Sequence, residues 1–428
     1  MTSTIFATST GLPPAAIAII RVSGPAAFAA AQRLVRSLPE PRRAAVRTVR
    51  DADGEMLDRA MLLVFPAPVT ATGEDVVEFH VHGGRAVVSA IEAALGSLPG
   101  LRRAGPGEFT RRALENGRID LAEAEGLADL LAAETDLQRR AALAMVDGSL
   151  SGRVDGWRRA LLSAAATLEA AFDFGDELDV AAGPETIDHA RIAAGDVRVA
   201  MELALAEPPV ERLRDGIRVV LAGPPNSGKS TLFNRLAGRD AAIISPIPGT
   251  TRDRIEAPVA RDGIPFVLID TAGLRDATDD IIERSGIERT GRAMDDADIV
   301  LWLGDDSPPV DRAIWIHARA DLAWRQDVPA GRMIAVADTD PASAEGLWQV
   351  LAAHAASIIP RPGDAMLNRR QREHVGYAVA ALHRVDDADE LIVAEMLRSA
   401  YMALGRINGN HDVEVMLDVL FSRFCIGK

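Results

Sequence analysis

A glycine-rich segment in the middle of the chain, Gly223-Pro-Pro-Asn-Ser-Gly-Lys-Ser230, constrains the fold more than any other. It follows an apolar run, 217–222, that predicts a buried strand, and it precedes an apolar segment that predicts a helix. In this strand–loop–helix context the G-x-x-x-x-G-K-[ST] pattern binds phosphate, because backbone N–H groups and the helix N-terminus face the ligand. The segment therefore predicts a P-loop domain with an α/β fold.

Two side chains of this loop have expected roles in binding a nucleoside triphosphate. Lys229 would reach the β- and γ-phosphates, and Ser230 would coordinate Mg²⁺. Lys229 is one of only two lysines, the other being Lys428, whereas all other basic residues are arginines. An ammonium is a compact point charge and a guanidinium is a wide planar fork. The survival of a lysine at this position favours a phosphate-binding role.

Two downstream segments predict the switches of a GTPase, which γ-phosphate orders and hydrolysis releases. The turn-rich loop 245–251 ends at Thr251, which would close on Mg²⁺ and the γ-phosphate. The apolar run 266–269 leads into a D-x-x-G sequence, with Asp270 beside the metal and the Gly273 N–H at the γ-phosphate. The predicted nucleotide-binding residues are Asn226, Ser227, Gly228, Lys229, Ser230, Thr231, Ser245, Pro246, Ile247, Pro248, Gly249, Thr250, Thr251, Asp270, Thr271, Ala272, Gly273 and Asp321.

The segment expected to recognise guanine is altered. In place of N-K-x-D the chain has Ala318-Arg319-Ala320-Asp321, so that Asp321 can accept from the base while Ala318 lacks the amide. The later S-A-K sequence is reduced to Val336-Ala337-Asp338. We expect weakened guanine affinity or selectivity, unless a backbone or water contact compensates for Ala318.

The chain also predicts a missing helix next to this segment. Only the nine residues 304–312 separate two predicted strands, 298–303 and 313–317. A parallel crossover usually needs a dozen residues or more. We therefore expect that the helix usual at this point has been trimmed away.

The remaining sequence predicts further domains. Residues 1–118 alternate apolar strands (17–22, 60–65, 76–81) with helices (26–34, 86–95), which indicates an α/β unit. Residues 119–214 have helical periodicity at 121–131, 157–172 and 187–205, and residues 361–428 return to helix. Because these two helical blocks flank the P-loop domain at 215–360, we expect them to pack together, with that domain inserted between them.

Composition excludes several classes of protein. The net charge of −15 argues against a protein devoted to non-specific nucleic-acid binding. One cysteine excludes a disulfide framework, and no apolar run reaches about 18 residues, as a membrane span would need. The N-terminus lacks the basic start of a signal peptide. We expect a cytoplasmic protein that does not enter the membrane.

Motifs along the whole chain resemble the MnmE (TrmE) family of tRNA-modification GTPases, within the potassium-dependent TrmE–Era GTPases. The P-loop and switch sequences share this resemblance with the E-R-x-G-I-E-R sequence that contains Glu283. The motifs outside the P-loop domain are Ile20-Arg21-Val-Ser-Gly24, Thr72-Gly-Glu-Asp-Val-Val-Glu78 with His82-Gly-Gly84, Gly105-Pro-Gly-Glu-Phe-Thr110, Asn116-Gly-Arg-Ile-Asp-Leu121 and Cys425-Ile-Gly-Lys428.

The resemblance implies a multi-domain fold: an α/β N-terminal folate-binding-like domain that also dimerises, a discontinuous α-helical domain, and an inserted Ras-like α/β P-loop G domain. It implies binding of 5-formyl- or methylene-tetrahydrofolate at a dimer interface. The positions that match the family's folate contacts are Arg21, Glu78, Arg118 and Lys428, with Arg118 where the family commonly has lysine.

The resemblance also implies a route to hydrolysis, because Leu274 replaces the glutamine that orients water in Ras-like proteins. K⁺ would supply the missing charge, and Glu283 would orient the water. The matching K⁺ ligands are Asn226, Ser245, Ile247 and Thr250. Cys425 is a candidate nucleophile or one-carbon contact. Taken alone, Glu283 is typical of a surface residue and Cys425 of an inert thiol.

The implied activity is modification of the wobble uridine of tRNAs at C5 with a carboxymethylaminomethyl-type group. The implied assembly is a homodimer that joins the FAD-containing protein MnmG in a heterotetramer or larger complex. Which tRNAs are modified, and whether glycine or ammonium enters the product, stay open. The alternatives are a ribosome-assembly GTPase, a scaffold without turnover, and a stand-alone folate enzyme with a vestigial G domain.

Overall fold

The computed structural model of the chain describes residues 3–173, 184–238, 242–243, 256–271, 291–325, 327–337, 340–361, 366–386, 388–409, 420–421, 424 and 427. Several predicted site residues lie outside these ranges: Ser245, Pro246, Ile247, Pro248, Gly249, Thr250, Thr251, Ala272, Gly273, Glu283, Cys425 and Lys428. The chain divides into two compact units. Unit 1 comprises Met1–Ala128, Met145–Gly152 and Gly405–Lys428, and unit 2 comprises Asp129–Ala144 and Arg153–Leu404.

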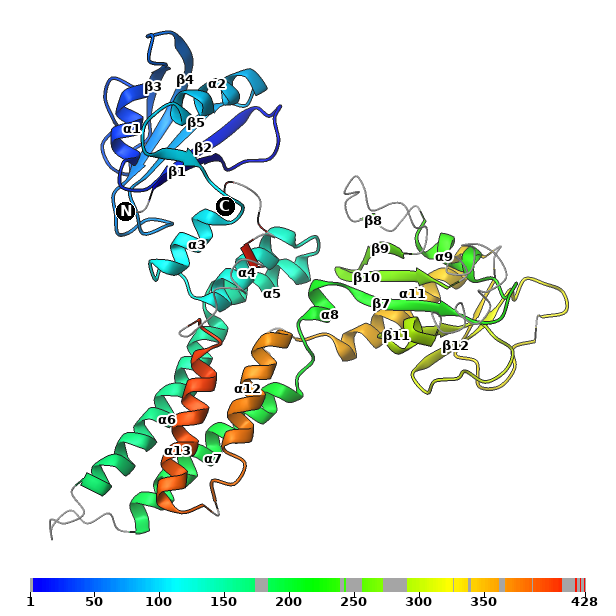
Figure 1. The fold of residues 1–428 in the computed structure, drawn as a ribbon. Coiled ribbons are helices and arrows are strands. Elements are labelled where there is room, and N and C mark those ends of the chain that lie inside the picture. Colours follow the sequence, from blue (N-terminus) through cyan, green and yellow to red (C-terminus); the bar gives the residue numbers. More distant parts are fainter. Residues whose placement is uncertain are drawn as a thin grey trace, which may run out of the picture. The chain divides into compact units, whose positions relative to one another are not determined.

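Unit 1 is built on a six-stranded sheet of order β3-β4-β5-β2-β1-β6. Only β1 and β6 pair in parallel, and the other neighbours are antiparallel. Its strands are β1 (Thr4–Thr8), β2 (Ile17–Ser23), β3 (Ala45–Arg50), β4 (Met56–Phe65), β5 (Val76–His82) and β6 (Leu101–Arg103). Helices α1 (Ala27–Leu34) and α2 (Arg85–Gly96) pack on this sheet (Figure 1). The strands and helices predicted here are confirmed, with ends shifted by up to a few residues.

Buried and half-buried side chains alternate along β5. Val77, Phe79 and Val81 are buried, whereas Glu78 and His80 are only half-buried. Successive side chains of a strand point to opposite faces. Glu78 therefore lies on the face away from the core of apolar residues that contains Phe79.

The rest of unit 1 joins segments that are distant in sequence. Helices α3 (Glu108–Glu115) and α4 (Leu121–Ala132) follow the sheet. Leu121 is fully buried in a cluster with Phe421 and Phe424. At Gly107, which has φ +63°, a Cβ would lie 2.7 Å from the Phe421 carbonyl oxygen, so the contact requires glycine. This packing joins the start of α4 to residues near the C-terminus within unit 1.

Some helices of unit 2 precede its sheet in the sequence, and others follow it. Before the sheet lie α5 (Asp136–Val146), α6 (Ser149–Asp173), α7 (Pro184–Ala206) and α8 (Glu211–Arg214), and after it lie α11 (Pro341–Ile358), α12 (Arg369–Ala381) and α13 (Glu390–Gly405). The last residues of α5 and the first residues of α6, within Met145–Gly152, belong to unit 1. Helix α7 packs along α12, and Arg158 of α6 lies over the ring of Tyr401 in α13 at 4.4 Å (Figure 1). Helices from the two predicted blocks thus contact each other. Among the described residues, no helix is both long and apolar enough to cross a membrane.

The sheet of unit 2 has seven strands in the order β13-β12-β11-β7-β10-β9-β8. The five from β13 to β10 run parallel, and β9 and β8 add antiparallel pairs. The strands are β7 (Ile217–Ala222), β8 (Ala242–Ile243), β9 (Glu256–Arg261), β10 (Ile264–Asp270), β11 (Ile299–Trp302), β12 (Ala313–Ala318) and β13 (Ile334–Val336). Its main core lies between the sheet and two helices, α9 (Lys229–Leu236) and α11.

The missing helix is confirmed. β11 and β12 are parallel neighbours, yet residues 303–312 between them contain no helix. Residues 319–333, between β12 and β13, contain no helix either in their described part. Two irregular segments therefore follow the carboxyl ends of β11 and β12.

Candidate functional site

The predicted phosphate-binding loop lies between a strand and a helix, as its sequence predicts. It connects β7 to α9, and three of its residues have positive φ: Gly223 (+148°), Asn226 (+61°) and Gly228 (+98°). Glycine adopts this region without steric cost, and asparagine tolerates it better than most residues. At Gly223 a Cβ would also lie 3.2 Å from the backbone nitrogen of Gly304. The loop therefore turns sharply against the start of the β11–β12 crossover.

Lys229, the first residue of α9, is buried over this loop. Its Nζ donates hydrogen bonds to the carbonyl oxygens of Gly223 (3.0 Å) and Pro224 (2.8 Å), and the residue is 7% exposed. A buried ammonium needs such partners, because burial penalises an unpaired charge. The loop thus holds one compact positive charge at its centre.

The Ser227 hydroxyl indicates that the loop fits an anionic ligand. Its Oγ is buried and has no hydrogen-bond partner among the described residues. Buried hydroxyl groups in proteins are nearly always hydrogen-bonded. A hydroxyl donor, the Lys229 ammonium and the N-terminus of α9 together form a donor set that suits the phosphates of a nucleotide.

Asp270 lies one strand away, at the carboxyl end of β10. It is 5% exposed and pairs in register with Leu221 of β7. The next residue, Thr271, donates its hydroxyl to the Leu221 carbonyl oxygen at 2.8 Å. The Thr271 side chain therefore ties β10 to β7. Asp270 is placed beside the loop, as a carboxylate near a nucleotide-bound metal must be.

The altered base segment reaches the phosphate loop through Arg319. This residue has φ +59°, and its Nη1 donates to the Asn226 carbonyl oxygen at 3.1 Å. Its aliphatic stem lies against Gly228, 3.5 Å from where a Cβ would stand. The following Ala320 N–H donates to the Val336 carbonyl oxygen at 3.0 Å, and Asp321 is exposed. Arg319 thus supports the loop, and Asp321 is accessible to a base.

These residues meet where ligands bind in parallel α/β sheets, at the carboxyl ends of the strands. The ends of β7, β10 and β12 supply the phosphate loop, Asp270 and the base segment respectively. The polar cluster of Arg325, Asp305 and His317 at the end of β12 was not predicted from the sequence. The only signal for it was the shortened crossover.

The predicted folate residues lie in unit 1, where Arg21 and Glu78 are paired with each other. They are register partners on β2 and β5, and the guanidinium donates to the Glu78 carboxylate from Nη2 (2.8 Å) and Nε (3.0 Å). His80 lies 3.3 Å from the other carboxylate oxygen, and Arg21 lies 5.7 Å from the Phe109 ring centre. Both charged side chains are partly exposed, at 24% and 15%. They form a polar pair that solvent reaches in part.

Arg118 is held at a separate turn of unit 1. Its Nε donates to the Thr70 carbonyl oxygen at 3.2 Å. Asn116 donates to the Thr72 carbonyl oxygen at 2.7 Å, and a Cβ at Gly73 would lie 2.8 Å from the Asn116 Cβ. Two of the sequence motifs, around residues 72–78 and 116–121, are therefore in direct contact.

Glu108 lies in the motif at residues 105–110, and its carboxylate makes the stability of unit 1 depend on pH. Burial opposes its ionisation, but hydrogen bonds from Arg102, the Gly105 N–H and Arg112 outweigh this and hold its pKa below the usual value. The resulting stabilisation is full above the unfolded pKa of about 4.3 and is lost as pH falls through the lower folded value. We expect Glu108→Gln to be less stable than the wild type at pH 7, and the difference to shrink as pH falls below about 4.3 and to close below the folded pKa of Glu108. Urea unfolding at several pH values measures this, and a constant difference would contradict it.

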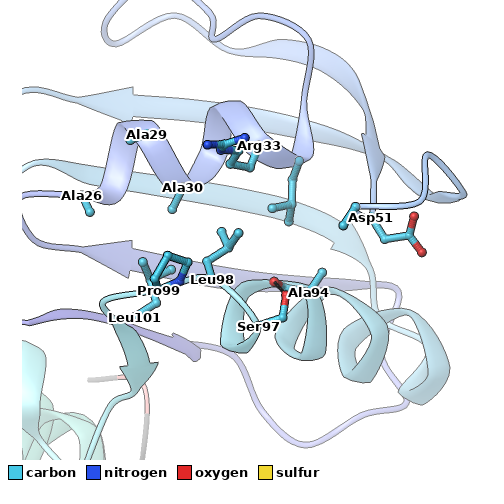
Figure 2. A pocket seen from close by; sticks show the side chains of 12 residues that line it. Ala26, Ala29, Ala30, Arg33, Asp51, Ala94, Ser97, Leu98, Pro99 and Leu101 are labelled. Carbon is cyan, nitrogen blue, oxygen red and sulfur yellow. Dashed lines mark hydrogen bonds between the residues drawn. The ribbon is translucent and has the colours of Figure 1, made fainter.

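A pocket of about 440 Å³ lies elsewhere in unit 1, beside α1 and the end of α2. Figure 2 shows Arg33 on α1 and Ser97 after α2 among the residues around it, with Asp51 contributing a carboxylate. Several alanines complete its wall. None of Arg21, Glu78 and Arg118 lines it. This pocket and the Arg21–Glu78 site are therefore distinct places at which a ligand could be tested.

Comparison with known proteins covers almost the whole chain. Residues 4–118 match the family described as GTP-binding protein TrmE N-terminus, and residues 121–425 match the MnmE helical domain. A protein of Novosphingobium aromaticivorans called tRNA modification GTPase MnmE is 53% identical over 442 residues, covering 100% of both chains. Proteins of the same name from Erythrobacter litoralis and Rhizorhabdus wittichii are each 52% identical and cover 99% of this chain, which spans 100% and 96% of them respectively.

Proposed function

Since the chain belongs to the MnmE family of tRNA modification GTPases, we propose that it hydrolyses GTP as part of the modification of tRNA. The observation that carries this proposal is the phosphate loop with its buried ammonium and its buried hydroxyl without a partner among the described residues. Both groups belong to residues at the N-terminus of α9, where negative charge is favoured. Asp270 and the exposed Asp321 stand at the ends of the neighbouring elements, where metal and base would be bound.

Residues of the loop and of the switch segments would bind the nucleotide and its ions. Lys229 would exchange its loop carbonyl partners for phosphate oxygens, and the Ser227 hydroxyl would donate to the nucleotide. Ser230 and Thr251 would hold Mg²⁺, and Asn226, Ser245, Ile247 and Thr250 would hold K⁺. These ions supply positive charge where negative charge develops during phosphoryl transfer. Glu283 would orient the attacking water.

We propose in addition that the seven-stranded sheet is a Ras-like G domain inserted into a discontinuous helical domain, and that unit 1 contains the folate-binding-like domain. Arg21, Glu78, Arg118 and Lys428 would contact 5-formyl- or methylene-tetrahydrofolate, and Cys425 would act on the one-carbon unit. The chain would act in the cytoplasm as a homodimer with MnmG, on C5 of the wobble uridine of tRNA.

Phosphate release from GTP, ATP and XTP, each in KCl and in NaCl at equal ionic strength, tests the hydrolase proposal. We expect turnover of GTP that requires K⁺. Equal rates in the two salts would contradict the potassium mechanism. Hydrolysis that ignores the base would contradict guanine recognition by the 318–321 segment.

The folate proposal predicts a loss of affinity in Arg21→Gln. The substitution removes two charge-assisted hydrogen bonds to Glu78 and one cation next to the site. We expect 5-formyl-tetrahydrofolate to bind about tenfold more weakly, as is typical when a hydrogen bond to a charged group is lost. Equilibrium dialysis measures this, with Arg33→Gln as the matched control in the other pocket. Weakening by the control alone would move the folate site to the pocket of Figure 2.

A further inference from the structure

Arg325 connects the end of β12 to the shortened crossover. Its Nη1 and Nη2 donate to the two carboxylate oxygens of Asp305, at 2.9 and 2.8 Å, and its Nε donates to the Ala318 carbonyl oxygen at 3.0 Å. The guanidinium therefore bonds to both segments at once. Its side chain is only 12% exposed, and Asp305 belongs to the segment that replaces the missing helix.

The backbone of Arg325 adds a second contact to the same strand end. Its carbonyl oxygen lies 2.8 Å from Nε2 of His317, a residue that is 3% exposed. Arg325 thus contacts the last two residues of β12, His317 and Ala318, and Ala318 is the first residue of the base segment 318–321. Arg332 makes a similar link one residue earlier in β12, because its Nη1 donates to the Ile316 carbonyl oxygen at 3.1 Å and to the Gly304 carbonyl oxygen at 2.7 Å.

The backbone of the crossover at Gly304 and Asp305 is held by hydrogen bonds from Arg332 and Trp315. Arg332, with a side chain only 2% exposed, donates to the carbonyl oxygens of Gly304 (2.7 Å) and Asp305 (2.9 Å) and lies 4.1 Å from the Trp315 ring centre. The Trp315 indole also donates to the Gly304 carbonyl oxygen, at 3.0 Å. Since Gly304 borders Gly223 of the phosphate loop, the crossover is continuous with the nucleotide site.

We propose that Asp305 and Arg325 form a clamp that positions the base segment 318–321, and so determines how much the base contributes to nucleotide affinity. The clamp replaces the support that the missing helix and the missing asparagine would provide. Exposed ion pairs contribute little to protein stability on average. A bidentate arginine that makes a third hydrogen bond, as Arg325 does, nevertheless fixes the position of the segments that it joins. Both residues act through the segment and are positioning residues. The inference rests on the proposed function.

The test compares the affinities of GDP and of pyrophosphate, because pyrophosphate contacts the phosphate loop without the base. In Arg325→Gln and in Asp305→Asn, we expect GDP to bind about tenfold more weakly, the typical effect of losing a hydrogen bond to a charged group, while pyrophosphate affinity falls much less, because only Arg319 passes the displacement on to the phosphate loop. In the double variant, we expect no further loss, because the two residues act as one unit. Competition against a fluorescent GDP measures all of these affinities.

Arg312→Gln is the matched control. Arg312 ends the same crossover but donates to the carbonyl oxygens of Met294 and Asp295, and none of its described bonds reaches the base segment. Since the Asp305 side chain is 68% exposed, Asp305→Asn keeps the test valid if Arg325→Gln fails to fold. Unchanged GDP affinity in folded Asp305→Asn would overturn the clamp alone. A wild-type chain that binds pyrophosphate but not GDP would overturn guanine recognition, and the clamp with it.

Discussion

A chain in which Lys229 is replaced by alanine is expected to lose GTP hydrolysis, with kcat lowered by about 100-fold or more, as when one preorganised donor to a transition state is removed. Lys229 supplies a buried positive charge at the centre of the phosphate loop, and its ammonium is already held by two loop carbonyls. Phosphate release under saturating GTP measures the effect. Circular dichroism shows whether the variant is folded.

The informative control is Lys229→Arg, because the chain has arginine at every other basic position except Lys428. If charge alone mattered, arginine would restore activity. We expect it to fail, since a planar guanidinium cannot occupy the space between the Gly223 and Pro224 carbonyls that a compact ammonium fills. Full activity of this variant would contradict the geometric argument for the surviving lysine.

Phe266→Ala is expected to destabilise unit 2 by about 3–5 kcal/mol, the usual range for removing a buried aromatic side chain. Phe266 is 1% exposed in β10, and its ring meets that of Trp348 in α11 edge-on, with centroids 5.3 Å apart. The cavity would lie directly under the strand that ends at Asp270. Urea unfolding followed by ellipticity measures the loss.

Phe266→Leu is the conservative partner, for which we expect a loss below about 1.5 kcal/mol. Phe79→Ala removes a buried phenylalanine of unit 1 and serves as the control for unit 2. It should destabilise unit 1 and leave GDP binding to unit 2 intact. Equal unfolding midpoints for Phe266→Ala and the wild type would show that this core repacks around the gap.

Local patterns in the sequence were sufficient to predict the strand and the helix on either side of the loop 223–230. The apolar run before Gly223 and the apolar periodicity after Ser230 confine the loop to a strand–helix junction, because each depends only on neighbouring residues. The same reasoning placed Asp270 at a strand end and detected the missing helix from a count of residues. The family resemblance, drawn from short motifs, is confirmed by matches over residues 4–118 and 121–425.

The contacts that complete the site could not be predicted in this way, because they join residues distant in sequence. The Arg325–Asp305 pair depends on the parallel order of β11 and β12, and the Thr271–Leu221 bond depends on the pairing of β10 with β7. The Arg21–Glu78 pair needs the register of β2 on β5. A sequence motif identifies such residues one at a time and does not reveal that they bind each other.

The burial of Leu121 against Phe421 and Phe424 has a consequence for protein synthesis. A ribosome releases Leu121 long before it makes these aromatic partners, and the whole seven-stranded sheet of unit 2 is translated in the interval. During that time the apolar face of α4 has no native cover from these residues, so nascent chains paused after β13 should expose it to chaperones. Unit 2 can form its sheet while unit 1 is still incomplete, and the first domain begun is therefore the last one finished.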